Sequence, residues 1–274
     1  MVSESTMTRR ITRAKRKIVG AAIAFRTDRD RLAERLVSVC AVVYAIYTEG
    51  HTSSADAALV RGDLCEEALW LAGLLHELEP DDPEVAGLLA LVLFSDARRA
   101  ERVAADGSVV LLADQDRSQW DRAKIGQGLA LLATAHSAGR RGPYQLQAAI
   151  AALHATAESY EQTDWPRIVD LYDVLIADGG DAVAALNRAA AVGHYRGADQ
   201  GLKALAELSS DQLERLSDYP YFYVCYGEFL AAVGDVEQAR GFYSEAIDRT
   251  KNVAERQHLI GRLNRVGDEC PNGR

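Results

Sequence analysis

Helix-forming residues run almost without interruption through this chain. Alanine and leucine recur throughout, aromatic residues make up only 7 %, and six prolines are spread over 274 residues. Proline interrupts helices, so its scarcity in an Ala- and Leu-rich chain favours an all-α architecture over a β-sandwich or barrel. Because 48 % of the residues are hydrophobic, the chain has ample apolar surface to bury. We therefore expect an all-α protein in which any sheet is minor.

Apolar residues at helical spacing, bounded by Gly, Pro, Asp or Ser, set the predicted helices. These cover residues 5–22, 32–47, 59–77, 84–99, 120–138, 144–156, 165–176, 182–195, 199–208, 221–233, 236–250 and 254–266. The Gly/Ser/Asp-containing segment 49–56 predicts a connection. The strongly apolar helix 84–99 is expected near the centre. Asp164 is expected to cap the helix over 165–176. Asp106-Gly107 between apolar flanks predicts one short β-hairpin near 103–112.

The C-terminal helices form predicted hairpins, and one hairpin carries a repeat-like pattern. Gly234, Ala239, Tyr243 and Ala246 have the spacing of the second helix of a tetratricopeptide repeat, and Gly197 begins a weaker echo 37 residues earlier. Such repeats build a short solenoid whose concave face commonly binds peptides or proteins. An ordinary helical bundle is the alternative interpretation.

Charge divides the chain unevenly. Residues 1–31 contain nine Lys or Arg against three Asp or Glu, a net charge of +6, so the total of −9 leaves −15 on the other 243 residues. A basic segment on an acidic body suggests an arm for a polyanion or an acidic surface, while the body should repel DNA. We predict three parts: a basic arm over 1–31, a helical domain over 32–160 and tetratricopeptide-like repeats over 161–274.

The helix predicted inside the arm is amphipathic, with apolar and cationic sides. Its apolar side consists of Met7, Ile11, Ala14 and Ile18. Its candidate DNA-binding side consists of Ser5, Thr8, Arg9, Thr12, Arg13 and Arg16. Residues near the N-terminal half of such a helix read bases, so Thr8 and Arg9 are the better base-facing candidates. A solvated cationic face is the alternative.

Motifs for metal, nucleotide or catalytic chemistry fail on inspection. Asp114 and Asp116 begin like an EF-hand loop, but Gln119 and Ile125 stand where Gly and Glu are required. These aspartates and Asp121 are instead expected to cap the helix that begins near Trp120 and to pair with Arg117 or Arg122. Gly126 and Gly128 lack the third glycine of a dinucleotide fingerprint, and the six histidines form no pair at i,i+4 spacing. Glu66, Glu67 and His76 could converge, but sequence alone does not show it. We expect no enzyme, no cofactor and no metal site.

Compartment is inferred from cysteine spacing and hydropathy. Cys40, Cys65, Cys225 and Cys270 fit neither a disulfide framework nor a metal knuckle, which favours free thiols in a reducing cytoplasm. No run reaches 18 apolar residues, so we predict no membrane span and no membrane partner.

Residues 2–18 (VSESTMTRRITRAKRKI) resemble the recognition helix in the fourth region of extracytoplasmic-function sigma factors of RNA polymerase. The rest of the chain resembles the long helical extension of the subgroup that ends in a tetratricopeptide-like domain. The segments that carry this likeness are 49–50 (EG), 64–69 (LCEEAL), 96–99 (DARR), 114–121 (DQDRSQWD), 142–150 (GPYQLQAAI), 163–165 (TDW) and 186–189 (LNRA).

The resemblance implies a transcription-initiation protein with core RNA polymerase and promoter DNA as partners, and a protein partner at the helical-repeat face. Sigma factors of this group begin with region two, which grips polymerase, and this sequence shows neither region two nor the first helix of region four. We therefore expect a shortened sigma factor that binds DNA weakly and does not initiate transcription alone. A helical-repeat adaptor with no DNA role is the second hypothesis.

Overall fold

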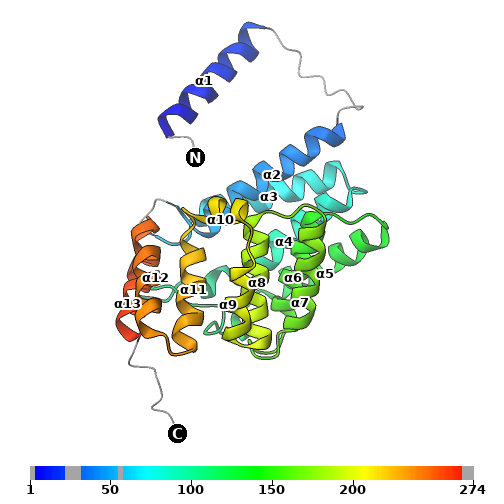
Figure 1. Cartoon of the computed structure of the whole chain (residues 1–274). Helices are drawn as coiled ribbons and strands as arrows, with labels where there is room; N and C mark the ends of the chain where they lie inside the picture. Colours follow the sequence, from blue (N-terminus) through cyan, green and yellow to red (C-terminus); the bar gives the residue numbers. More distant parts are fainter. Residues whose placement is uncertain (1–3, 22–31, 55–57, 267–274) are drawn as a thin grey trace. The chain divides into compact units, whose positions relative to one another are not determined.

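The helices begin and end close to where apolar periodicity predicts them. The computed structural model describes residues 4–21, 32–54 and 58–266, and over these ranges it is helical with no strand, which confirms the all-α class (Figure 1). The elements are α1 Glu4–Gly20, α2 Leu32–His51, α3 Gly62–Leu78, α4 Pro83–Asp96, η2 Arg99–Arg102, η3 Arg117–Gln119, α5 Arg122–Ser137, α6 Pro143–Thr156, α7 Trp165–Ala177, α8 Ala182–Arg196, α9 Ala198–Ala206, α10 Ser210–Leu216, α11 Pro220–Ala232, α12 Val236–Arg249 and α13 Val253–Arg265.

The chain divides into two compact units. The first, Met1–Val39, holds α1 and the first part of α2, and the second, Cys40–Arg274, holds every later element. The end of the predicted basic arm falls within 22–31, which lies outside the described residues. The second unit therefore supplies the packing described below.

Helix α4 is the centre of the second unit's N-terminal half, as its apolar sequence predicts. Asp82 caps it by accepting hydrogen bonds from the backbone N–H groups of Glu84 at 2.9 Å and Val85 at 3.1 Å, and Pro83 opens its first turn. Its side chains are buried almost all round, against α3, α5 and α6. The helix ends at Asp96, three residues before the predicted end, and η2 begins at Arg99 after a two-residue turn.

Helix α4 also caps its neighbour α6. The carboxylate of Glu84 accepts the backbone N–H of Tyr144 at 3.0 Å and that of Gln145 at 3.1 Å, and it accepts the Gln145 amide at 3.1 Å. The first N–H groups of a helix have no partner inside the helix and carry partial positive charge. Glu84 therefore fixes the start of α6 against α4.

The predicted connection over 49–56 is wrong at its beginning, because α2 continues to His51. Gly50 lies inside this last turn and faces α3, where a Cβ would come within 2.7 Å of the backbone nitrogen of Cys65. The glycine marks a close approach of two helices instead of a helix end. Residues 55–57 of the connection lie outside the described part.

The segment 103–112 contains one isolated antiparallel bridge, between Val103 and Val109. Gly107 takes a φ of 85° and its N–H donates to the carbonyl of Ala104, which closes a turn over 104–107 centred one residue before the predicted Asp106-Gly107. Within the described ranges no ladder extends from this bridge, and the two-stranded hairpin stays a prediction.

The second half of the unit is a series of helical pairs, α7 with α8, α8 with α9, α11 with α12 and α12 with α13 (Figure 1). Asp164 caps α7 as predicted, through the N–H of Arg167 at 3.0 Å. The seven-residue α10 was not predicted, because it is short and has only two apolar residues, Leu213 and Leu216. A capping box between Ser209 and Gln212 stabilises its start instead.

Phe229 of α11 joins two of these pairs. Its ring lies against Gly193 of α8 and Gly201 of α9, and a Cβ at either glycine would enter the ring. The surrounding core includes Leu205, Leu216 and Cys225. Both glycines are therefore packing requirements of this core.

Asn252 ties the last helix of the unit to its beginning. Its side-chain amide donates to the carbonyl oxygens of Ser53 and Ala58, each at 3.0 Å, while its oxygen accepts the N–H of Glu255 at 3.1 Å and so caps α13. The side chain is 2 % exposed. One buried residue thus performs two structural tasks.

Candidate functional site

The predicted DNA-binding residues all lie on α1. Thr8, Arg9, Thr12, Arg13 and Arg16 are exposed there, whereas the side chain of Ser5 is outside the described part. The three arginines are spaced four and three residues apart, which places them along one side of the helix. This side can contact successive phosphates of a duplex.

The same helix exposes more than this side. Met7 is 45 % and Ile11 49 % exposed, and Arg10, Lys15 and Lys17 are exposed as well. The other two residues of the predicted apolar seam, Ala14 and Ile18, have side chains outside the described part. The described surface of α1 is therefore cationic on more sides than the sequence analysis proposed.

The aspartates before α5 have capping roles. Asp121 accepts the N–H of Lys124 at 3.1 Å and caps α5 as expected, but Asp116 accepts the N–H of Ser118 at 2.9 Å and caps η3 instead. The cation closest to the Asp121 carboxylate is Lys124, at 3.6 Å, so the expected pairing with Arg117 or Arg122 is wrong for this residue. The described residues contain no cluster of three or more His, Cys, Asp or Glu side chains placed to hold a metal ion.

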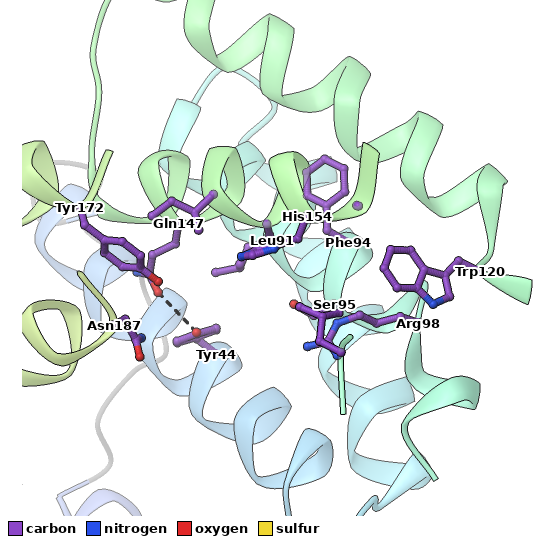
Figure 2. A pocket seen from close by; sticks show the side chains of 14 residues that line it. Tyr44, Leu91, Phe94, Ser95, Arg98, Trp120, Gln147, His154, Tyr172 and Asn187 are labelled. Carbon is purple, nitrogen blue, oxygen red and sulfur yellow. Dashed lines mark hydrogen bonds between the residues drawn. The ribbon is translucent and has the colours of Figure 1, made fainter. Parts of the chain in front are cut away.

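A cavity of about 210 Å³ lies between α2, α4, α6, α7 and α8 in the second unit (Figure 2). The sequence did not indicate this cavity, because its lining comes from five helices and from the segment before α5. The lining residues are Tyr44, Leu91, Phe94, Ser95, Arg98, Leu112, Trp120, Gln147, Ile150, Ala151, His154, Ala155, Tyr172 and Asn187. Tyr44 donates to the side-chain oxygen of Gln147 at 3.4 Å, which joins α2 to α6 across one end of the cavity.

Arg98 is the charged residue of this lining. Its neighbour Arg99 forms ion pairs with Asp96 at 3.2 Å and with Glu66 at 3.4 Å. Glu66, which could have lain close to Glu67 and His76, thus has Arg99 as its ion-pair partner. Among the described residues no carboxylate pairs with Arg98. Burial lowers the pKa of Arg98 to about 10, and Arg102 acts in the same direction, so the guanidinium stays charged at neutral pH.

Two further arginines make the surroundings of Arg98 electropositive. Arg102 donates to the carbonyl of His51 and to the hydroxyl of Thr52, and Arg117 donates to the carbonyls of His154 and Ala157. Burial lowers the pKa of both arginines, while the negative charges of Glu255 and Glu161 act in the opposite direction on Arg102 and Arg117 respectively. Neither arginine forms an ion pair with a carboxylate in the described part of the chain. The combined field favours an anion near Arg98.

His154 is neutral in this setting. Burial lowers its pKa to about 4, and the charges of Arg98 and Arg117 add to this effect. Its Nδ1 and the indole Nε1 of Trp120 are both buried without a hydrogen-bond partner in the described structure. Buried polar atoms in proteins are nearly always paired with protein or ordered water, so these two atoms are available to a ligand or to water.

A second hollow of about 550 Å³ lies over α5, α6 and α7. Its floor is apolar, with Leu132, Leu146, Leu171 and Val174, and charged side chains such as Arg167 stand among its lining. None of the described helices combines the length and the apolar character needed to cross a membrane.

Comparisons with known proteins give relatives without an assigned activity. The model of a family of unknown function, DUF6596, matches residues 35–136, which contain α4 and Arg98. An uncharacterized protein of Rhizobium meliloti (strain 1021) is 41 % identical over 270 residues, which is 98 % of this chain and 63 % of that protein. The chain thus spans less than two thirds of this relative's length. No solved structure matches.

Proposed function

We propose that the chain acts in transcription initiation, as the C-terminal portion of an extracytoplasmic-function sigma factor with a tetratricopeptide-like extension. The observation that carries this proposal is the exposed cationic surface of α1, with Arg9, Arg13 and Arg16 on one side of the helix. The resemblance of residues 2–18 to a promoter-reading helix gives this surface its target. The match to a longer relative is compatible with a chain that works as part of a larger protein.

Charge supports a division of labour within this function. The first 31 residues carry +6 and the remainder −15, so attraction to phosphates is confined to the arm while the acidic body is repelled. DNA binding by this chain should therefore be weak and strongly dependent on salt. Regulation and contacts to polymerase are then the role of the helical body.

The packing of α12 supports a tetratricopeptide-like second half. Ala239, Tyr243 and Ala246, the residues of the repeat pattern, are all fully buried, and a Cβ at Gly227 of α11 would lie 3.3 Å from the Tyr243 ring. Small and aromatic residues at these positions pack the two helices of a repeat closely together. Partner binding at the concave face of such repeats is part of the proposal.

The test measures binding of the full chain to core RNA polymerase and, separately, to a promoter duplex at about 50 and about 200 mM salt. Replacing Arg9, Arg13 and Arg16 together by Ala should reduce the slope of log affinity against log salt by about three, since each phosphate contact contributes about one. The matched control replaces the exposed Arg140, Arg167 and Arg256 of the body by Ala. Equal DNA binding by the two triple variants would contradict a DNA role for α1.

A helical-repeat adaptor without a DNA role is the second candidate. The hollow over α5–α7 favours it, because an apolar floor with Arg141, Arg167 and Asp170 around it suits a short amphipathic peptide. In this case the two triple variants behave alike with DNA, and polymerase binding is absent. The two functions are thus separated by the same experiment.

A further inference from the structure

We propose that the cavity around Arg98 binds a small organic carboxylate that carries a second hydrogen-bonding group at its far end. This inference concerns the helical body and does not rest on the role proposed for α1. Four lines of observation support it: charge, shape, unpaired polar atoms and size.

The charge of the lining selects a monoanion. Arg98 is the charged side chain of the cavity, and no carboxylate of the described chain neutralises it. Arg98 is half-buried, so its charge is only partly hydrated, and a bound anion would compensate for the water it has lost. The planar guanidinium fork matches the two oxygens of a carboxylate in a bidentate contact. Arg102 and Arg117 strengthen the attraction, although Arg102 donates to His51 and one terminal nitrogen of Arg117 donates to His154.

The shape of the cavity separates the charged end from a polar end. In Figure 2, Arg98 lies on one side with Ser95 and Trp120, and Tyr172, Gln147 and Asn187 lie on the other. Leu91 and Ile150 add apolar surface to the lining, and Tyr44 closes the polar end through its hydrogen bond to Gln147. A ligand that fits has a carboxylate at one end, an apolar middle and a hydroxyl or carbonyl at the other end.

Two buried polar atoms of the lining have unfilled hydrogen-bonding capacity. Nδ1 of His154 and Nε1 of Trp120 have no partner in the described structure, and the indole can only donate. A ligand oxygen near Arg98 can accept from Trp120, which lies on the same side of the cavity in Figure 2. Neutral His154 can donate or accept according to its tautomer.

The volume of about 210 Å³ limits the ligand to metabolite size. A cavity of about 150 Å³ accommodates benzene, so this one holds roughly eight to ten non-hydrogen atoms. A ligand of this size with one charge-assisted contact is expected to bind at about millimolar concentration or tighter.

The experiment is calorimetric titration of the full chain with para-hydroxybenzoate and with the aliphatic keto acid levulinate, in a buffer free of carboxylate and phosphate. We expect saturable binding of at least one of the two acids. Para-hydroxybenzamide, which has the same shape without the charge, should bind about ten- to a hundredfold more weakly than para-hydroxybenzoate. Absence of saturable binding of both acids up to about 10 mM overturns the proposal.

Variants assign the binding to the cavity. Arg98→Met keeps the aliphatic stem and removes the charge, so acid binding should fall at least about tenfold while the melting temperature of the free protein rises. Arg256→Met, on the exposed surface of α13, is the matched control and should bind the acids like the wild type. Undiminished acid binding by a folded Arg98→Met protein overturns the proposal.

A second variant tests the polar end without touching the charge. Gln147→Leu should weaken binding of para-hydroxybenzoate to the level of benzoate, and benzoate itself should bind this variant as it binds the wild type. This result supports the two-ended ligand even if Arg98→Met does not fold. Equal loss of both acids in Gln147→Leu contradicts the assignment of the polar end.

Discussion

The ring of Phe229 lies where the side chain of any residue other than glycine at position 193 would have to be placed. Gly193 belongs to α8 and Phe229 to α11, so this contact sets how closely two helices of different pairs approach. The same ring also lies against Gly201 of α9, which is the third helix at this contact. Three helices therefore meet around one aromatic side chain, and two glycines define the space.

Gly193→Ala should lower the free energy of unfolding by about 2 kcal/mol, because the added methyl overpacks a dense core. Urea denaturation monitored by circular dichroism measures this change. Gly241→Ala is the control: Gly241 lies in α12 with no atom within 4 Å of an added Cβ, so the better helix propensity of alanine should leave stability equal or higher. A neutral Gly193→Ala would show that Phe229 can move.

Asn252→Asp should lower the free energy of unfolding by at least about 2 kcal/mol. The carboxylate keeps the cap on Glu255 but loses both donor hydrogens and faces the carbonyl oxygens of Ser53 and Ala58. Asp235→Asn at the start of α12 is the reverse exchange at a cap without this burial and should change stability by less than about 0.5 kcal/mol. Thermal melts of the two variants at equal concentration make the comparison, and similar melting temperatures would exclude the donor role.

Glu84→Ala should destabilise the protein by about 2 kcal/mol, since it removes a carboxylate that accepts two backbone N–H groups of α6. Glu84→Gln retains an acceptor oxygen without the charge and should lose about half as much. Chemical denaturation gives both values. Glu77→Ala on exposed α3 surface is the control and should stay within about 0.5 kcal/mol of wild type. Equal effects of Glu84→Ala and Glu77→Ala would contradict the capping role.

Acidification should destabilise the second unit through His154. The folded-state pKa is lowered to about 4 by burial and by Arg98, Arg117 and His194, against about 6.5 in the unfolded chain. The unfolded state therefore binds the proton first, and stability is lost as the pH falls from about 6.5 towards 4. Between pH 7 and 5 this one group contributes a loss of about 2 kcal/mol.

His154→Gln removes this contribution and leaves the other titrating groups in place. Its free energy of unfolding should fall by about 2 kcal/mol less than that of the wild type between pH 7 and 5, as measured by urea denaturation at both values. Parallel pH profiles of the two proteins would show that His154 does not cause the loss of stability on acidification.

Sequence periodicity predicted most helices because each one buries a single apolar stripe or, in α4, its whole circumference. It failed where a residue has a tertiary role. Gly50 suggested a helix end, yet α2 continues through it. The residue is a glycine because the backbone of α3 comes too close for a side chain. Helix α10 has only two apolar residues in seven and begins with the capping box of Ser209 and Gln212, so its apolar pattern is too short to indicate it.

The site was predictable in one part only. The cationic side of α1 follows from residue spacing within a single helix. The cavity does not, because Arg98 and Arg99 are adjacent and chemically identical in the sequence. Arg99 reaches Asp96 and Glu66, while Arg98 faces a space lined by residues up to Asn187. The difference between a paired and an unpaired arginine arises from the packing of α4 among its neighbours.

The hydrogen bond from Asn252 to Ser53 spans 199 residues, and this distance has a meaning for synthesis as well as for stability. At about 5–20 residues per second, a ribosome needs roughly 10–40 s to make the chain between the two partners. During that interval the carbonyl groups of Ser53 and Ala58 lack the donor that Asn252 supplies. Ser53 and Ala58 are therefore among the first residues of the second unit to be made and among the last to acquire their hydrogen bond from Asn252.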